Sequence, residues 1–305
     1  MKSHKAQQGQ PFLPSLRGSP QEKCGLDPIF AGVDMTSIPV RPAPTANSEA
    51  HERLQIIAHE KTHKKVLQIF SELKERGSLL EIPAGEGALA WQLKKLGYDV
   101  TGGDIDPKFF KIASIPCLHL DMNRRFPLDD EQFNFVSCVE GIEHLQDQFH
   151  FVRECHRVLK PGGMMVLSTP NILNLASRLK FLLSGFYSLV PRPINEFSVV
   201  PVFDHINPVT YYQLRYMLHT QGFEIARVSV DFYRRSSAAL YFLKPLARLY
   251  SLRTMRKETD LQQRKANQHI REVLCSRDLL LGRTLIVVAR KKEARAIPTV
   301  QASEV

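Results

Sequence analysis

A short run of residues near position 80 combines two glycines with two acidic side chains. In LLEIPAGEG (79–87), an apolar strand leads into a glycine turn, and a helical pattern follows. Gly85 and Gly87 have no side chain, so the backbone can bend sharply there and approach a ligand closely. Together with Ala90 they satisfy the G-x-G-x-x-A spacing of dinucleotide-binding turns. A tight turn between strand and helix, without a ligand, is the alternative.

The acidic residues of this turn separate two kinds of nucleotide ligand. A dinucleotide places its anionic pyrophosphate over such a turn, at the N-terminus of the helix. Glu81 at the strand end and Glu86 inside the turn would repel that pyrophosphate if they face it. S-adenosylmethionine carries no phosphate, and its ammonium and sulfonium groups suit acidic neighbours. The acids therefore favour the sulfonium cofactor.

Further acidic residues follow the next two predicted strands. Asp104 ends the second strand, where a carboxylate can accept hydrogen bonds from both ribose hydroxyls. A simple turn or cap is its alternative, and Asp106 before Pro107 is the better candidate for a helix cap. Asp121 follows the short third strand, where its carboxylate can accept from an adenine amino group while Met122 packs on the purine.

Several of these motifs occur together, in one order along the chain. The order LLEIPAGEG, GDIDP, LDM, FNFVSCVEGIEHLQD and RVLKPGGMMVLSTPN resembles the class I S-adenosylmethionine-dependent methyltransferases. The pattern is most similar to type 11 and type 23 methyltransferase domains, which include ubiquinone-biosynthesis O-methyltransferases. The resemblance covers about residues 78–170 and resumes at DHINPVTYYQLRYMLHTQGFEI. It implies transfer of the cofactor's methyl group to an O, N or C atom, with O-methylation favoured.

The resemblance also implies a role for each matching position on the cofactor side. The residues expected to line the methionine half of the cofactor are Glu81, Ala84, Gly85, Gly87 and Glu140. The residues expected at the ribose and adenine are Asp104, Ile105, Asp121 and Met122. One position departs from the family, which usually has glycine where this chain has Pro83. Proline fixes φ near −65° and lacks an N–H, so the start of the turn is expected to differ.

On the acceptor side, Glu143 and His144 follow the fourth predicted strand. A neutral imidazole can take a proton from a hydroxyl, which makes this pair the catalytic candidate, and the pair could also help bind a divalent ion. The alternative is an acid at a helix start beside a histidine that supports the loop. His205 is a candidate substrate contact, with a loop or cap role as its alternative. The spacing of the remaining histidines and acids does not indicate a metal site, so none is predicted.

Strands that alternate with helices predict the element order around these residues. The spacing implies parallel pairing with right-handed crossovers, hence a doubly wound, mostly parallel seven-stranded sheet of Rossmann-like type. The last strand, RTLIVVAR, is expected to be antiparallel. Helices are expected at 52–77, 87–97, 107–114 and 148–160, the last closed by Pro161-Gly162-Gly163 before a strand at 164–170. A further, capped helix is expected in NPVTYYQLRYMLHTQGF (207–223).

Composition divides the chain into an arm, a domain and a tail. We expect a flexible arm at 1–50, a methyltransferase domain at 51–292 and a disordered tail at 293–305. Two irregular insertions are expected at about 171–209 and 233–282. Both mix Leu, Phe and Tyr with Lys and Arg, which suits an amphiphilic acceptor or a peripheral membrane contact as well as a lid or a dimer contact. The oligomeric state stays open.

Charge and cysteine usage limit the remaining classes. The net charge of +10 is compatible with an acidic partner or with basic residues spread over exposed faces, and no basic block resembles a nucleic-acid arm. The five widely spaced cysteines and the polar N-terminus favour a cytoplasmic protein. RNA methylation is disfavoured because the fourth strand lacks the N/D-P-P-Y/F signature. A catalytically silent, methyltransferase-like binding module remains the other alternative.

Overall fold

The computed structural model of the protein describes residues 54–189, 193–194 and 205–293. The expected arm at 1–50, Cys24, and residues 294–305 of the expected tail lie outside these ranges. The first expected insertion, 171–209, is described only in part.

A seven-stranded sheet forms the centre of the described part, with the strand order β3-β2-β1-β4-β5-β7-β6. The strands are β1 (Ser78–Glu81), β2 (Asp99–Asp104), β3 (Cys117–His119), β4 (Phe133–Val139), β5 (Leu159–Pro170), β6 (Phe223–Val230) and β7 (Thr284–Lys291). The pairs among β1 to β5 are parallel, whereas β7 runs antiparallel to both of its neighbours. The predicted fold class, with its antiparallel last strand, is therefore confirmed.

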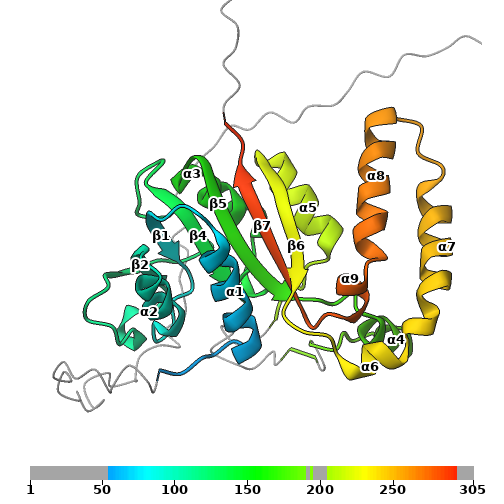
Figure 1. The fold of residues 1–305 in the computed structure, drawn as a ribbon, viewed down its shortest axis with the longest axis horizontal. Helices are drawn as coiled ribbons and strands as arrows, with labels where there is room; N and C mark the ends of the chain where they lie inside the picture. Colours follow the sequence, from blue (N-terminus) through cyan, green and yellow to red (C-terminus); the bar gives the residue numbers. More distant parts are fainter. Residues whose placement is uncertain (1–53, 190–192, 195–204, 294–305) are drawn as a thin grey trace, which may run out of the picture. The chain divides into compact units, whose positions relative to one another are not determined.

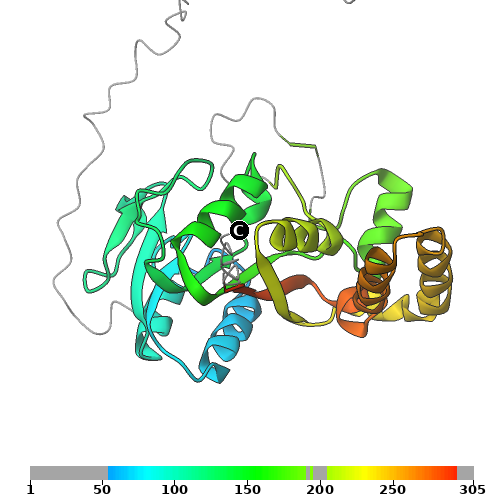
Figure 2. The same cartoon turned by 90° about the horizontal axis from the view of Figure 1, so that it is seen from above.

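Helices cover both faces of this sheet (Figure 2). Helices α1 (Glu60–Glu72) and α2 (Ala88–Lys95) pack on one face, and α3 (Gln148–Val158) and α5 (Tyr211–Thr220) on the other. Adjacent residues of a strand supply the two cores alternately: Leu79 joins the α1/α2 core, and Leu80 joins the α3/α5 core. This alternation follows from the two-residue period of a strand. It explains why the central strands are apolar on both sides.

Two expected helices are shorter than predicted. The helix expected at 52–77 spans only α1, and the segment before it crosses the glycine turn, where the Gln55 amide donates to Glu86. The helix expected at 107–114 is a single 3-10 turn at Pro107–Phe109. The chain extends at Phe110, whose ring fills the space beside Gly87 and Gly102. Tertiary contacts override the helical spacing in both places.

The expected boundary between α3 and the fifth strand was also wrong. Helix α3 ends at Val158, and β5 already begins at Leu159, so Pro161-Gly162-Gly163 lies inside the strand. The pairing register with β4 shifts between Phe133 and Phe135, which accommodates these residues as an irregularity near the start of the strand. A Cβ on Gly163 would lie 2.8 Å from the Lys160 carbonyl oxygen, so glycine is needed there.

The segments expected to be irregular contain helices (Figure 1). They are α4 (Leu175–Ser184), α6 (Arg235–Ala239), α7 (Lys244–Met255), α8 (Leu261–Leu274) and α9 (Arg277–Leu281), with a 3-10 turn at Tyr241–Leu243. Pro245 does not interrupt a helix, because it lies in the first turn of α7. Its missing N–H has no intrahelical acceptor to lose there. Within the described ranges, no helix is long and apolar enough to cross a membrane.

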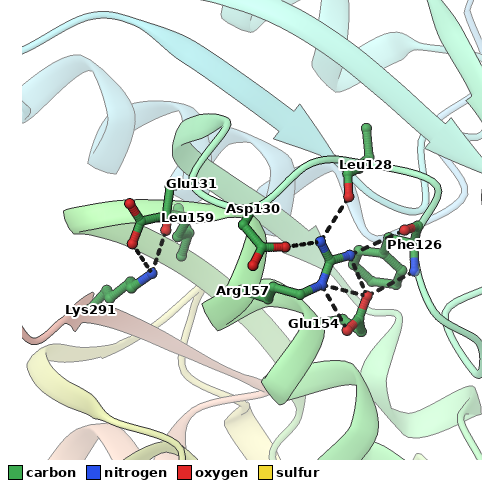
Figure 3. Close-up of polar contacts among 8 residues, drawn as sticks. All are labelled: Phe126, Leu128, Asp130, Glu131, Glu154, Arg157, Leu159 and Lys291. Atoms are coloured by element: carbon green, nitrogen blue, oxygen red, sulfur yellow. Dashed lines mark hydrogen bonds and ion pairs between the residues drawn. The ribbon is translucent and has the colours of Figure 1, made fainter.

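An arginine on α3 holds the connection between β3 and β4 (Figure 3). The Arg157 guanidinium donates to the carbonyl oxygens of Phe126 at 3.1 Å and Leu128 at 2.7 Å. The same group pairs with Asp130 at 2.7 Å and Glu154 at 2.6 Å. Only 16% of the Arg157 side chain and 10% of the Glu154 side chain are exposed, so this pair is well shielded from water, whereas Asp130 is exposed. This network fixes the loop that follows Asp121.

Candidate active site

The glycine turn after β1 has the backbone geometry that its sequence predicts. Gly85 and Gly87 both have positive φ, 53° and 90°, a region that favours glycine. A Cβ on Gly87 would lie 2.8 Å from both Phe110 and Ile112, so a side chain there would displace the packing beneath the turn. The Ala84 amide still donates to the Gly103 carbonyl at 3.0 Å. The turn is therefore formed despite the proline before it.

Pro83 packs against the glycine that follows the fourth strand. A Cβ on Gly141 would lie 2.7 Å from Pro83 Cδ, so the proline ring occupies the space that a side chain would need. The departure from the family pattern thus links the ends of β1 and β4, which are neighbouring strands. Both ends belong to the carboxyl edge of the sheet, where ligands bind in open α/β folds.

Asp104, at the end of β2, is bonded to this turn. Its Oδ2 accepts from the Gly85 amide at 2.8 Å, and its Oδ1 accepts from the Asp106 amide at 3.0 Å. A carboxylate offers about four lone-pair sites, so about two remain for other donors. Asp106 itself caps the 3-10 turn by accepting from the Lys108 amide, as expected. The Asp104 carboxylate can thus hold the turn and still accept from the two hydroxyls of a ribose.

Glu81, at the end of β1, is a buried acid with an unpartnered oxygen. Its residue is 4% exposed, and Oε2 has no hydrogen-bond partner among the described residues. Burial raises the pKa of this carboxyl well above its usual range, and the nearby Asp104 raises it further. A cationic ligand would supply the missing partner and favour the ionised form. The residues present therefore fit the ammonium group of the expected cofactor.

The second acid of the turn does not face a ligand. Glu86 forms an ion pair with Lys111 and accepts from the Gln55 amide at 2.8 Å. These contacts outweigh the opposing effect of burial and lower the pKa of Glu86. The expectation that Glu86 would act on the ligand's charge is therefore not supported by its contacts. Its carboxylate instead ties the segment before α1 to the turn.

The adenine-side candidates differ in how they are placed. Asp121 accepts from the Asn123 amide at 2.9 Å and pairs with Arg124 at 3.2 Å, so local contacts fix its loop. Met122 packs partly buried against the α3/α5 core, while Ile105 is 47% exposed. An exposed aliphatic side chain beside Asp104 offers an apolar surface that a flat ring can cover.

Glu140, just after β4, forms an ion pair with Arg283. It has a positive φ of 49°, which is uncommon for a residue with a side chain. Its Oε1 lies 3.2 Å from Arg283 Nη1 and accepts from the Thr284 hydroxyl at 3.0 Å. The backbone of Glu140 directly follows β4, at the edge of the sheet where the methionine half of the cofactor is expected. Its carboxylate is paired with Arg283. The sequence did not single out Arg283.

Glu143, His144 and His205 form a cluster on the acceptor side. One ligand-type atom from each residue lies within 4.8 Å of those of the other two. The imidazole rings of His144 and His205 meet edge to face, with centroids 4.9 Å apart. Burial raises the pKa of Glu143 to about 8, and its Oε2 accepts from the Thr169 hydroxyl at 3.1 Å. The three predicted residues are thus brought together, although sequence spacing had not indicated a metal site.

The side-chain amide of Gln148 and the backbone amide of Asn207 hold this cluster in place. Gln148 donates to the carbonyl oxygens of Ile142 at 2.9 Å and Asn207 at 2.7 Å. The Asn207 amide donates to the Glu143 carbonyl at 2.9 Å. These bonds join the turn after β4 to the segment that carries His205. No local signal marks Gln148, since its partners are set by tertiary contacts. Thr169, at the end of the β5 strand, had a signal: a polar residue after an apolar run.

Comparison with known proteins agrees with this arrangement. Residues 80–167 match the family described as "Methyltransferase domain". The demethylmenaquinone methyltransferase of Chlorobaculum tepidum is 30% identical over 149 residues, 47% of this chain and 60% of that protein. The ubiquinone biosynthesis O-methyltransferase of Xanthomonas oryzae pv. oryzae is 29% identical over 130 residues, 39% of this chain and 54% of that protein. The chain therefore matches less than two thirds of the length of these curated relatives.

A solved structure shares the fold. The crystal structure of a SAM dependent methyltransferase from Archaeoglobus fulgidus has a TM-score of 0.50 and 19% sequence identity. The match covers 76% of this chain and 94% of that chain. At this level of identity the likeness concerns the fold alone, and it agrees with the sheet described above.

Proposed function

This chain carries a class I S-adenosylmethionine-dependent methyltransferase domain, and we propose that it transfers the cofactor's methyl group to an oxygen of a small or amphiphilic acceptor. The observation that carries the proposal is the placement of two groups of residues. Glu81 and Asp104 end neighbouring strands β1 and β2, while Glu143, His144 and His205 cluster just beyond β4. A cofactor-binding edge and a proton-handling cluster therefore lie at the same end of the sheet.

On the cofactor side, the chain's residues bind and orient. The cofactor supplies an electrophilic methyl group on its sulfonium. Glu81 offers a buried carboxylate oxygen to the ammonium group, and Asp104 offers its remaining lone pairs to the ribose. Because the glycine turn is already formed, little rearrangement is needed on binding. Orientation of this kind lowers the barrier of a displacement by removing entropy in advance.

On the acceptor side, His144 is the residue for which we propose a role in activating the acceptor hydroxyl. It belongs to the 3-10 turn η3 (Ile142–His144), which directly follows β4. Its ring contacts His205, the proposed substrate contact. Loss of the hydroxyl proton leaves an oxygen nucleophile for in-line attack on the methyl group. Glu143 is buried below the turn and supports it rather than touching the acceptor.

The first experiment separates an enzyme from a silent binding module. Purified protein is titrated with S-adenosylhomocysteine and with NAD in a calorimeter, and then incubated with S-adenosylmethionine and an acceptor panel. Two relatives carry names that refer to demethylmenaquinone and to ubiquinone biosynthesis, so quinol-type hydroxyls head the panel, with RNA as a comparison. We expect the protein to bind S-adenosylhomocysteine and not to bind NAD comparably. We also expect it to methylate a quinol-type hydroxyl. Binding without any product across the panel would favour the silent module.

An amphiphilic acceptor is supported by apolar side chains on two helices outside the sheet. On α4, Leu182 and Leu183 are each 78% exposed. Helix α7 has no buried residue and exposes Leu246 and Leu249, and it lies on the far side of α8 from the sheet (Figures 1 and 2). A shallow cavity of about 300 Å³ on α7 is lined by Leu249 together with Arg248 and other residues of the helix. Basic and apolar side chains together suit an anionic, lipid-like surface.

Liposome co-sedimentation tests this part of the proposal. Anionic and neutral vesicles are compared at low and high salt, with the full chain and a variant carrying Leu246→Gln and Leu249→Gln. Deleting 238–256 is less suitable, because Leu240, Tyr241 and Leu243 pack on buried core residues. We expect salt-sensitive binding to anionic vesicles that the glutamine variant loses. The control carries Tyr216→Gln, at an exposed position of α5. Wild-type protein that stays in the supernatant throughout would exclude the membrane-surface role.

A further inference from the structure

Arg234, four residues after the end of β6, has a buried guanidinium nitrogen that lacks an acceptor. Its Nη1 has no hydrogen-bond partner among the described residues. Burial lowers the pKa of this guanidinium, and the positive charge of Arg283 lowers it further. A shielded donor without an acceptor costs more than an ordinary hydrogen bond contributes. An anionic ligand would supply the acceptor and offset the repulsion between the two guanidinium groups.

Arg234 and Arg283 lie on two chain segments that continue the pairing of β6 with β7. Arg283 N donates to the Phe232 carbonyl at 3.0 Å, and Arg234 N donates to the Leu281 carbonyl at 2.8 Å. The two arginines are therefore diagonal neighbours across this ladder, a separation that long side chains can bridge. Strand β7 begins beside Pro170, the last residue of β5 (Figure 1). The arginines thus lie at the same end of the sheet as the cofactor and acceptor residues.

The two acids nearest to this pair already have donors. Glu140 pairs with Arg283 and accepts from the Thr284 hydroxyl at 3.0 Å. Asp231 accepts from the Thr284 amide at 2.9 Å and lies 3.6 Å from Arg283. Both acids therefore share the charge of Arg283, which leaves the charge of Arg234 for a ligand.

The strand order separates this pair from the amino-acid end of the cofactor. The order β1-β4-β5-β7-β6 places β6 four strand spacings, about 19 Å, from β1, which ends at Glu81. The ammonium and carboxylate groups of S-adenosylmethionine share one carbon, so a cofactor held through Glu81 keeps its carboxylate near β1. The proposed acceptor residues are nearer, since Glu143 is bonded to Thr169 in β5, the strand beside β7. An anionic group at Arg234 is therefore assigned to the acceptor.

We propose that Arg234, with Arg283 beside it, binds a carboxylate or phosphate group of the methyl acceptor. This inference rests on the proposed methyl transfer and narrows its acceptor to an anionic hydroxyl compound. Arginine suits the role, because its planar fork can donate two parallel hydrogen bonds to one carboxylate or phosphate. The Arg283 side chain is 20% exposed, which leaves an approach from solvent. The anion would then orient the acceptor from the β6–β7 side while its hydroxyl lies beside His144.

Equilibrium binding of matched probes tests the site without any turnover. With and without S-adenosylhomocysteine, the protein is titrated with 4-hydroxyphenylacetate, with its uncharged amide and with inorganic phosphate. We expect the acid to bind at least about tenfold more tightly than the amide, and phosphate to compete with the acid. Arg234→Gln should weaken binding of the acid by about 10- to 100-fold, and Arg234→Lys by less. The control is Arg235→Gln, which removes the same charge at an exposed neighbouring position and should bind as the wild type does.

Urea denaturation shows whether Arg234 has a structural role instead. Because Nη1 has no partner to lose, Arg234→Gln should not lower the free energy of unfolding. Arg234→Gln protein that still prefers the acid over the amide would overturn the proposal. Wild-type protein that binds the acid no better than the amide, or that binds neither the acid nor phosphate, would overturn it as well.

Titration of S-adenosylhomocysteine keeps a failure of this proposal apart from a failure of the proposed function. Wild-type protein that binds S-adenosylhomocysteine without preferring the acid would overturn the anion site and leave the proposed function intact. If Arg234→Gln instead weakens S-adenosylhomocysteine binding about tenfold or more, the anion is the cofactor's carboxylate and the assignment to the acceptor is wrong. Preference for the acid without S-adenosylhomocysteine binding would retain the anion site and remove the proposed cofactor.

Discussion

Replacing Asp104 by Ala tests the cofactor side most directly, because its carboxylate serves two purposes. Two of its lone pairs hold the amides of Gly85 and Asp106, and about two remain for ribose hydroxyls. A hydrogen bond to a charged group contributes roughly 1.5–3 kcal/mol, reduced when water replaces it. We therefore expect Asp104→Ala to weaken S-adenosylhomocysteine binding by about 2–4 kcal/mol, or about 30- to 1,000-fold.

The same substitution should also lower stability, and the two effects must be measured separately. Losing the bonds to Gly85 and Asp106 should lower the free energy of unfolding by about 1–3 kcal/mol. Urea denaturation without ligand gives this quantity, and calorimetric titration of the folded variant gives the affinity. Asp106→Ala is the matched control, since that carboxylate only caps a 3-10 turn. Unchanged affinity in folded Asp104→Ala protein would refute the ribose assignment, whatever happens to stability.

Three further predictions concern single side chains. His144→Ala should reduce turnover by about 10²–10⁴-fold while the affinity for S-adenosylhomocysteine stays nearly intact. Comparable losses of that affinity and of thermal stability would instead assign His144 a structural role. Arg157→Ala should lower the free energy of unfolding, measured in urea, by about 3–5 kcal/mol, because the shielded Glu154 carboxylate loses its ion-pair partner and keeps only the Phe126 amide as a donor, whereas Arg157→Lys should lose less. Burial lowers the pKa of His63 to about 4, below its unfolded value, so stability should fall as the pH drops from about 6.5 to 4, by at most about 3 kcal/mol. The free energy of unfolding of His63→Gln, measured by denaturation at each pH, should change less over that range. An equal pH dependence in the variant and the wild type would contradict the assignment.

The sheet could be predicted because its signals are local. Strands β1 and β4 and the second half of β5 are apolar runs that are buried on both faces, which makes them hard to miss. Strands β2 and β3 are less apolar and less buried, and they are recognised by their place between helical segments and turns. Helix α5 also carried its own signal, since Thr210 and Gln213 form the capping box that their spacing suggests. The same reasoning failed for Leu54 and Ile57, which have helical spacing but lie before α1. The spacing of apolar residues does not indicate that the segment before α1 instead crosses the glycine turn after β1.

The helices of the second insertion were missed although two of them have capping residues. Asp260 accepts from the Gln263 amide at 2.6 Å at the start of α8, and Ser276 caps α9 by accepting from the Leu279 amide. Both are ordinary N-cap residues, so the sequence contained the signal. Helix α7 was harder, because it buries no residue and so has no apolar stripe facing a core. An amphipathic period depends on burial, and here burial is absent.

The predicted site residues were chosen by position along strands, and their surroundings depend on contacts that the sequence does not display. Glu81 and Asp104 follow from their place at strand ends, whereas the pairing of Glu86 with Lys111 depends on a fold over the turn. His205 was named without a partner in view. Its contact with His144 requires the end of the first insertion to return to the turn after β4, and Gln148 holds it there by donating to the Asn207 carbonyl.

Polar contacts join the two insertions to the end of the sheet that carries the candidate site residues. Arg283, where the second insertion returns to β7, lies 3.2 Å from Glu140 and 3.6 Å from the buried Asp231. Asn171, where the first insertion begins, donates to the carbonyl oxygens of Leu279 and Gly282, each at 2.9 Å. The two insertions are thus bonded to each other, and Arg283, directly after the second, is paired with Glu140, which directly follows β4. An acceptor held by α4 or α7 would therefore sit on elements that are fixed to the same strand ends as the cofactor residues. Leu246 and Leu249 of α7 are exposed and belong to no buried cluster. Their replacement by glutamine should therefore change the surface of α7 and leave the contacts at the strand ends intact.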